Sequence, residues 1–249
     1  MIDGHIHFHK QPYTLETIEN MVSVAKEKNI DEIWLLDHTH KFHEFIFLYE
    51  PVMHNELSAN WFRKKKFISI NEYLDFTSLV KSRAYDVKIK FGLEVCYFPE
   101  TENLLREELK KYQFDFLIGA VHFIDGIGFD LSKEAWIGVD VDQMYKRYYE
   151  IMELLIESEL FTTLAHPDSI KLYNYYPTYD LKPTYLRIAQ LLNKHQMSTE
   201  NNTGLWRYQF PYPGLNPEFL EVLKKAQVRI HLSSDAHEYK YIGAYFNCL

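Results

Sequence analysis

The chain has 249 residues, a formal net charge of −8 and 47% hydrophobic residues. This length suits one α/β barrel, and this composition supports a large core and argues against wholesale disorder. Proteins that bind nucleic acid without sequence preference are usually basic, so the negative net charge argues against a nucleic-acid partner.

The first half of the chain alternates predicted strands with predicted helices. The helix over 15–28 has Thr14 as its expected N-cap, and Ser69 is expected to cap a helix that ends near residue 83. The segment 39–67 is expected to be irregular, and loops of that length are usually functional or mobile. A charged helix is expected over 100–112, and the predicted strands cover residues 1–7, 32–36, 88–98 and 114–124.

The second half continues the same alternation. Asn216 is the expected N-cap of a helix that begins with Pro217 at its first position. The other predicted helices cover 140–159 and 184–195, and the predicted strands cover 162–165, 198–203 and 228–233.

The alternation, repeated about seven times, indicates parallel βαβ units. We read residues 1–249 as one domain, because no linker, repeat or low-complexity tract divides the chain. The expected fold is an irregular, seven-stranded α/β barrel, and an open doubly wound sheet is the alternative.

Candidate metal ligands follow the ends of these predicted strands. In an α/β barrel the carboxyl ends of the strands converge on one face, where active sites lie. Histidines placed at random would be scattered over helices and both ends of the barrel. The polar residues at or just past strand ends are His7, Asp37, His38, Glu94, His122, His166, Asp235 and His237.

Strand geometry adds further residues to this set. Because side chains alternate with period two, Asp3, His5 and His7 point to one side of the first strand, and His9 joins them if the strand continues. Asp235 and His237 share a face if the last strand stays extended. Each strand can therefore offer two ligands to one ion or to two adjacent ions.

The chemistry of the set favours particular metals. Neutral imidazole and carboxylate suit Zn, Mn or Fe, whereas an all-carboxylate site would indicate Mg or Ca. Burying so many polar groups without partners would cost several kcal/mol, so a purely structural role is unfavourable. Isolated histidines such as His195, on a predicted helix, fit surface roles instead.

The two cysteines, Cys96 and Cys248, form no CxxC pair and no disulfide framework. Residues 1–9 lack the basic and apolar regions of a signal peptide, and no stretch approaches the roughly 20 apolar residues of a membrane span. We therefore expect a cytoplasmic enzyme with no membrane partner.

The ordered set of motifs resembles the polymerase and histidinol phosphatase (PHP) family. Any one match is weak, but together they keep the family's order and span nearly the whole chain. The resemblance implies a distorted (β/α)7 barrel with a trinuclear metal centre at the carboxyl ends of its strands. The matches are Asp3-Gly4-His5-Ile6-His7, Leu36-Asp37-His38, Gly92-Leu93-Glu94, Gly119-Ala120-Val121-His122-Phe123, Ala165-His166-Pro167-Asp168 and Ser234-Asp235-Ala236-His237.

The resemblance also implies a role for each candidate ligand, in three sites for divalent Zn, Mn or Fe. The third site normally takes another histidine from the loop after the first strand, and His9 is the nearest candidate here. The implied ligands are His5, His7, Glu94 and Asp235 for the first metal, Glu94, His122 and His166 for the second, and His38, His237 and His9 for the third.

Within the family the chain looks most like the free-standing histidinol-phosphate phosphatases. That branch hydrolyses L-histidinol phosphate, a small phosphate monoester of histidine biosynthesis, with a hydroxide bridging two metals as the nucleophile. Asp235 or His237 would handle the proton for the leaving alkoxide. Arg207 would grip the phosphate, and Glu200 and Phe123 would receive the rest of the substrate.

Three other functions remain open at this stage. A PHP phosphoesterase of another kind, such as a phosphotyrosine phosphatase or a polymerase-type nuclease, would keep the ligands and change the pocket. An amidohydrolase-like enzyme acting on C–N bonds would usually need a carboxylated lysine, which we do not find. A metal-binding module without catalysis would close its coordination sphere.

Overall fold

The computed structural model describes residues 1–8, 11–208 and 210–249. Seven strands of the described chain form one parallel sheet in the order β1-β2-β3-β4-β7-β8-β9. Every neighbouring pair in this sheet is parallel. The strands are β1 (Ile2–His7), β2 (Glu32–His38), β3 (Lys88–Cys96), β4 (Phe116–Ala120), β7 (Thr163–Leu164), β8 (Ser198–Asn202) and β9 (Ile230–Ser233).

The two edges of this sheet approach each other and nearly close a barrel. Ile6 of β1 forms a parallel bridge with Ala236, just beyond β9. The His7 amide donates to the Ala236 carbonyl at 2.8 Å, and the Ala236 amide donates to the His5 carbonyl at 3.4 Å. The predicted distorted (β/α)7 barrel is therefore confirmed, and the open-sheet alternative is wrong.

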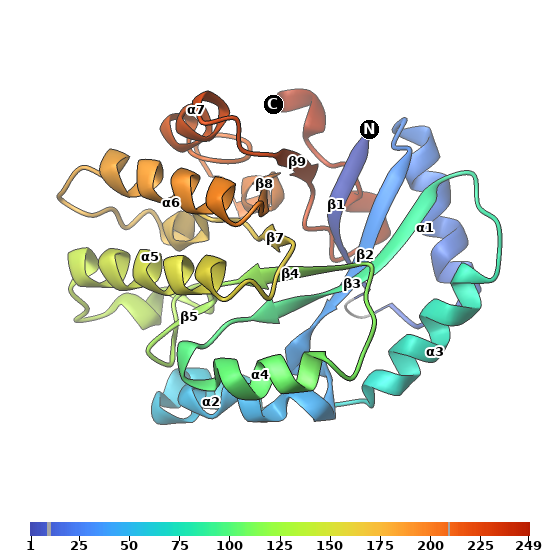
Figure 1. Cartoon of the computed structure of the whole chain (residues 1–249), viewed down its shortest axis with the longest axis horizontal. Coiled ribbons are helices and arrows are strands. Elements are labelled where there is room, and N and C mark those ends of the chain that lie inside the picture. Colours follow the sequence, from blue (N-terminus) through green and yellow to red (C-terminus); the bar gives the residue numbers. More distant parts are fainter. Residues whose placement is uncertain (9–10, 209) are drawn as a thin grey trace.

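The helices lie outside the strands (Figure 1). Three N-caps predicted from the sequence are confirmed, because Thr14, Ser69 and Asn216 each accept a hydrogen bond from a backbone amide of the first turn. The helices are α1 (Leu15–Glu27), α2 (Glu56–Arg63), α3 (Ile70–Lys81), α4 (Glu102–Leu109), α5 (Val141–Glu157), α6 (Lys182–Lys194) and α7 (Pro217–Lys225).

The hydrophobic core has two parts, as strand alternation requires. The larger part joins the helices to the outer face of the sheet and includes Ile18, Leu35 and Tyr145. A smaller, separate cluster lies on the other face of the strands and includes Leu36, Phe116, Ile118, Ala120 and Ala165. Below the polar strand ends, the inner face of the barrel therefore contains an apolar cluster.

Two predicted segments differ from the structure. The stretch 39–67, expected to be irregular, contains α2 and several 3₁₀ turns. The strand expected over 114–124 stops at Ala120, and Phe123–Ile124 instead forms β5, which pairs antiparallel with β6 (Ile127–Gly128). Strand alternation places His122 on the same inner face as Ile118 and Ala120, and its side chain still reaches the carboxylate of Glu94 although the barrel strand has ended.

The Asp3-Gly4-His5 segment packs tightly against the last strand. A Cβ atom at Gly4 would lie 2.2 Å from Cδ2 of His231, so the approach of β1 to β9 needs glycine at this position. Asp3 is fully buried, and its carboxylate accepts hydrogen bonds from the Ser234 amide (2.9 Å), the Ser234 hydroxyl (2.6 Å) and the Gly243 amide (2.7 Å). Asp3 therefore fixes the backbone directly before Asp235.

None of the helices in the described part of the chain has both the length and the apolar character that crossing a membrane requires.

The Ser69 cap gives a test of how α3 is stabilised. Ser69 and Glu72 form a capping box, and the Ser69 hydroxyl also donates to Glu44 at 2.8 Å. We expect Ser69→Ala to lower the free energy of unfolding by about 1 to 2 kcal/mol in urea denaturation, because the first turn loses its side-chain acceptor. Ser78→Ala, an exposed change inside the same helix, should alter it by less than about 0.5 kcal/mol. Equal effects of the two substitutions would contradict the capping role.

Candidate metal centre

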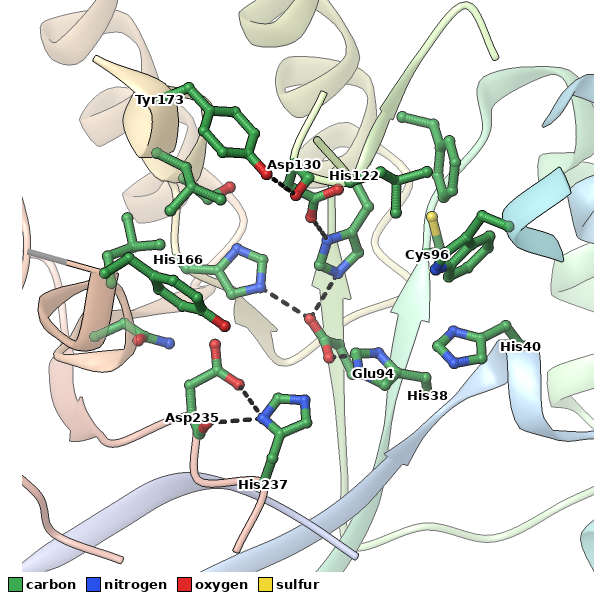
Figure 2. A pocket seen from close by; sticks show the side chains of 18 of the residues that line it. His38, His40, Glu94, Cys96, His122, Asp130, His166, Tyr173, Asp235 and His237 are labelled. Carbon is green, nitrogen blue, oxygen red and sulfur yellow. Dashed lines mark hydrogen bonds and ion pairs between the residues drawn. The ribbon is translucent and has the colours of Figure 1, made fainter. Parts of the chain in front are cut away.

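The candidate ligands meet at the mouth of the barrel, where the parallel strands end. Figure 2 shows side chains from separate strand ends pointing toward a common centre at Glu94. The structure brings together every predicted ligand that it describes, whereas His9 lies outside the described residues. The ligands that meet are His5 and His7 of β1, His38 of β2, Glu94 of β3, and His122, His166, Asp235 and His237, which follow β4, β7 and β9.

Glu94 occupies the middle of the cluster and is only 1% exposed. Its Oε1 atom lies 2.9 Å from Nε2 of His122 and 2.9 Å from Nε2 of His166. Its Oε2 atom lies 2.8 Å from Nδ1 of His38, which pairs with Glu94 in the register of β2 and β3. Burial alone would raise the pKa of Glu94, but the nearby imidazoles, His38 foremost, outweigh burial and hold that pKa well below its usual range. The carboxylate is therefore ionised.

A second group of ligand atoms joins His5, His7 and Asp235. The Nε2 atoms of His5 and His7 lie 2.9 Å apart. Oδ1 of Asp235 lies 3.3 Å from Nε2 of His7 and 3.8 Å from Nε2 of His5. The same two nitrogens lie 3.3 and 3.4 Å from Oε2 of Glu94. Two imidazoles and two carboxylates thus surround one small volume.

A third group consists of His7, His38 and His237, with ligand atoms within 4.8 Å of one another. The rings of His38 and His237 each stack on the ring of His7, with centroids 4.2 Å apart. Burial lowers the pKa of His237, although Asp235 opposes this shift. His237 therefore presents a neutral imidazole, which is the form that binds metal.

Hydrogen bonds behind the cluster fix the tautomers of three candidate ligands. A carboxylate or carbonyl oxygen can only accept, so the facing Nδ1 atom carries a hydrogen, and in the neutral, metal-binding form of the ring Nε2 presents its lone pair to the cluster. In all three cases Nδ1 is the donor. It donates to Oε1 of Glu200 in His5 (2.8 Å), to Oδ2 of Asp130 in His122 (2.9 Å) and to the carbonyl of Asp235 in His237 (3.0 Å).

These atoms fit a bound divalent cation. With its hydrogen on Nδ1, a neutral His122 directs the lone pair of Nε2 at the ionised Oε1 of Glu94, only 2.9 Å away. A proton or a cation must lie between the two atoms to offset their repulsion. Among the described residues, Oε2 of Glu94 accepts no hydrogen bond of normal geometry despite three imidazole nitrogens within 3.4 Å. Imidazole and carboxylate donors in this arrangement suit Zn, Mn or Fe.

Two candidate ligands have unusual backbone conformations. His166 has a φ of 20° and Asp235 a φ of 50°, in the region that non-glycine residues rarely adopt. Such conformations cost about 1–3 kcal/mol each and occur preferentially at functional sites. The chain does not stay extended beyond β9, which was the condition for Asp235 and His237 to share a face. It turns at Asp235 and still delivers both side chains to the cluster.

The cluster lies in a pocket of about 760 Å³. The segment 39–67 supplies one wall with Tyr49, Trp61 and Lys65, and Phe123 packs against Trp61 with ring centroids 5.4 Å apart. Tyr173 lies on the opposite side, where its hydroxyl donates to the carbonyl of Asp130 at 3.0 Å (Figure 2). The pocket thus combines a polar floor with aromatic walls.

The three predicted substrate contacts occupy different places. Phe123 lines the pocket. Arg207 also lines it, but its Nη1 and Nη2 atoms donate to the carbonyls of Ser234 (2.8 Å) and Asp235 (2.7 Å). Glu200 is fully buried behind His5, away from the pocket surface. A substrate in the pocket therefore cannot reach Glu200, and the expected contact is wrong.

Several pocket residues escaped the sequence analysis. Asp130 supports His122, yet it follows the short β5–β6 hairpin and not a strand of the barrel, so the strand-end rule does not reach it. Trp61 and Lys65 belong to the segment that was expected to be irregular. The strand-end rule that selected the candidate ligands concerns only the barrel strands, whereas these residues of the pocket walls come from segments between them.

Comparison with known proteins identifies the family. The sequence model described as "PHP domain" matches residues 3–204. The chain belongs to the PHP domain family. A "Probable histidinol-phosphatase" of Deinococcus radiodurans is 25% identical over 192 residues, which cover 76% of this chain and 72% of that protein. A protein of the same name from Schizosaccharomyces pombe is 25% identical over 194 residues, and the match covers 71% of this chain and 63% of the relative.

Two solved structures have the same fold. The "putative histidinol phosphatase hisK" of Listeria monocytogenes matches with a TM-score of 0.80 and 20% identity, over 100% of both chains. A histidinol phosphate phosphatase of Lactococcus lactis, complexed with zinc, L-histidinol and phosphate, matches with a TM-score of 0.70 and 19% identity. That match covers 96% of this chain and 87% of the other.

The protonation of the cluster leads to a prediction about metal binding. Burial would lower the pKa of His122, but Glu94 and Asp130 outweigh it and raise that pKa to about 10. His122 is therefore protonated at pH 7 without metal, and a bound ion must displace its proton. We expect Zn²⁺ binding to release about one proton or more per chain, measured by isothermal titration calorimetry in buffers of different ionisation enthalpy. A binding heat that is the same in all buffers would contradict this.

Proposed function

We propose that the chain is a metal-dependent histidinol-phosphatase, which hydrolyses L-histidinol phosphate to L-histidinol and phosphate. The observation that carries this proposal is the buried, ionised Glu94 surrounded by imidazoles at the mouth of a PHP barrel. The substrate follows from the names of both curated relatives and from the L-histidinol and phosphate in the Lactococcus lactis structure. The reaction would be a step of histidine biosynthesis.

Three divalent ions are proposed, held as the family resemblance implies. Zinc is the first choice because the Lactococcus lactis structure is a zinc complex, and Mn and Fe suit the same ligands. The first ion would be held by His5, His7, Glu94 and Asp235, the second by Glu94, His122 and His166, and the third by His38 and His237, with His9 as the further expected ligand.

The bound ions would supply a water of lowered pKa, about 7 in favourable sites, and would offset charge on the phosphoryl oxygens. Asp235 is well placed to move the protons of the reaction. Its side chain is 21% exposed and lines the pocket. Burial would raise the pKa of Asp235, but His5 and other imidazoles outweigh burial and hold that pKa well below its usual range. The ionised carboxylate would accept a hydrogen bond from the attacking water, whose acidity the ions would supply. The low pKa makes Asp235 a weak base, so a proton that it takes from that water would pass readily to the leaving alkoxide.

His237 is less suited to donate a proton to the leaving group. Its Nδ1 hydrogen is directed at the Asp235 carbonyl, and Nε2 of the neutral ring carries a lone pair. We therefore assign His237 to metal binding and Asp235 to proton transfer.

The walls of the pocket suit the organic part of the substrate. Phe123 and Trp61 offer aromatic surface to an imidazole ring, within a pocket of about 760 Å³. Arg207 is proposed to contact the phosphate while two of its N–H groups hold the Ser234 and Asp235 carbonyls. Such a contact would be charge-assisted and therefore strong.

The substrate is tested by a phosphate-release screen on metal-replete protein. We expect kcat/KM for L-histidinol phosphate to exceed that for phosphotyrosine, glycerol phosphate and p-nitrophenyl phosphate. Faster release from another monoester would reject histidinol phosphate as the preferred substrate and would favour a different PHP phosphoesterase. Full activity after removal of metal by a chelator would reject the metal-dependent mechanism itself.

The central role of Glu94 is tested by substitution. Glu94→Gln should lower kcat by at least about 100-fold and reduce bound metal, because an amide cannot supply the two anionic oxygens that face the imidazoles. Glu32→Gln is a matched control on the neighbouring strand. Glu32 lies at the opposite end of the barrel and pairs with Lys88 and Lys90, so metal content and kcat should stay close to wild type. Normal activity of Glu94→Gln would remove the basis of the proposal.

A further inference from the structure

Glu200 is a carboxylate at the back of the cluster with three hydrogen-bond donors around it. It is 0% exposed, and it lies on β8, which contributes none of the implied ligands. We propose that Glu200 is a positioning residue that couples the first and second metal sites by holding one ligand of each. This inference rests on the metal centre of the proposed function.

The first contact fixes a side chain. Nδ1 of His5 donates to Oε1 of Glu200 at 2.8 Å, and both side chains are fully buried. This bond keeps the His5 hydrogen on Nδ1 and directs the Nε2 lone pair toward His7 and Asp235. A carboxylate behind a ligating histidine orients the ring and raises its basicity.

The second contact fixes a backbone. The amide of His166 donates to Oε2 of Glu200 at 3.1 Å. At this residue φ is 20°, a conformation that persists only where surrounding contacts impose it. Among the described residues, Nδ1 of His166 has no hydrogen-bond partner, so no bond at that nitrogen restrains the ring. The backbone bond to Glu200 therefore helps to set the direction in which His166 reaches Glu94.

The third contact holds the carboxylate itself in place. Nδ2 of Asn202 donates to Oε2 of Glu200 at 2.9 Å. The rings of His5 and His166 also stack, with centroids 5.8 Å apart and an interplanar angle of 29°. One rigid carboxylate thus sets the relative positions of two ligands that come from β1 and from the segment after β7.

Asp130 provides the natural comparison. Its Oδ2 atom accepts from Nδ1 of His122 at 2.9 Å, and among the described residues its carboxylate forms no hydrogen bond with a ligand proposed for the first site. Losing the Asp130 carboxylate should therefore weaken the second site alone, whereas losing the Glu200 carboxylate should weaken both sites.

The glutamine variant at residue 200 separates these two cases. Gln keeps the shape of Glu but has a single acceptor oxygen, and its NH₂ group can only donate. It can satisfy either the Nδ1–H group of His5 or the amide of His166, and its NH₂ group then faces the other donor. Glu200→Gln thus breaks the link between the sites with a minimal change of volume.

The experiment compares wild type, Glu200→Gln, Asp130→Asn and Glu102→Gln. Glu102 is the matched control, because it binds Tyr97 and Arg106 outside the pocket. Zinc per chain is measured after equilibration against chelators of graded strength, and the visible spectrum of Co²⁺-loaded protein is recorded. Circular dichroism establishes that each variant is folded.

We expect Glu200→Gln to lose about 10- to 100-fold in affinity at two zinc equivalents together, with a changed Co²⁺ spectrum. Asp130→Asn should lose affinity at one equivalent only, and Glu102→Gln should match wild type. If Glu200→Gln does not fold, Glu200→Asp keeps the charge but is one methylene too short to span both partners, and the same double loss is expected.

Loss of a single equivalent, or no loss, in a folded Glu200 variant would overturn the coupling and leave the proposed function intact. Wild-type protein that binds no zinc would overturn the metal centre and the coupling together. The zinc content of the wild-type protein therefore tells the two failures apart.

Discussion

A carboxylate that is ionised and almost completely buried must be balanced by positive charge close by, and Glu94 is such a group. Both of its oxygens face imidazole nitrogens, at 2.8 to 3.4 Å. Neutral imidazoles with lone pairs directed inward cannot supply that balance. Protons or cations must therefore lie within the cluster, and the ligand atoms are the ones that divalent metals prefer.

The rest of the barrel can be understood as support for this arrangement. Parallel strands carry their carboxyl ends to one mouth, so ligands far apart in the sequence meet there. The strained backbone at His166 and Asp235 turns two of these ligands inward. Glu200 and Asp130 hold His5 and His122 from behind, and Asp3 fixes the backbone before Asp235. The segments between strands then build the aromatic walls of the pocket.

The sequence predicts the barrel and the convergence of the ligands because both follow from local rules. Strand alternation places His5 and His7 on one side, and strand ends mark Glu94, His122 and His166. Asp235 and His237 follow the end of β9, and the extended backbone that would have put them on one face is absent, since the chain turns at Asp235.

The contacts of Glu200 and the contents of segment 39–67 depend on other features. Glu200 lies two residues before the end of β8, which places it below the mouth and behind His5, and depth along a strand cannot be read from alternation. Helix α2 is only eight residues long, so its apolar spacing gives a weak signal. Asp130 approaches His122 through a hairpin whose geometry depends on packing between distant segments.

The most direct test of the central claim is a crystal structure of protein grown with Zn²⁺ or Mn²⁺, with anomalous difference density measured at the absorption edge of the metal. We predict anomalous peaks within ligand distance of the Glu94 carboxylate and of the surrounding histidines. Crystals that contain stoichiometric metal but show no anomalous peak at Glu94 would contradict the account.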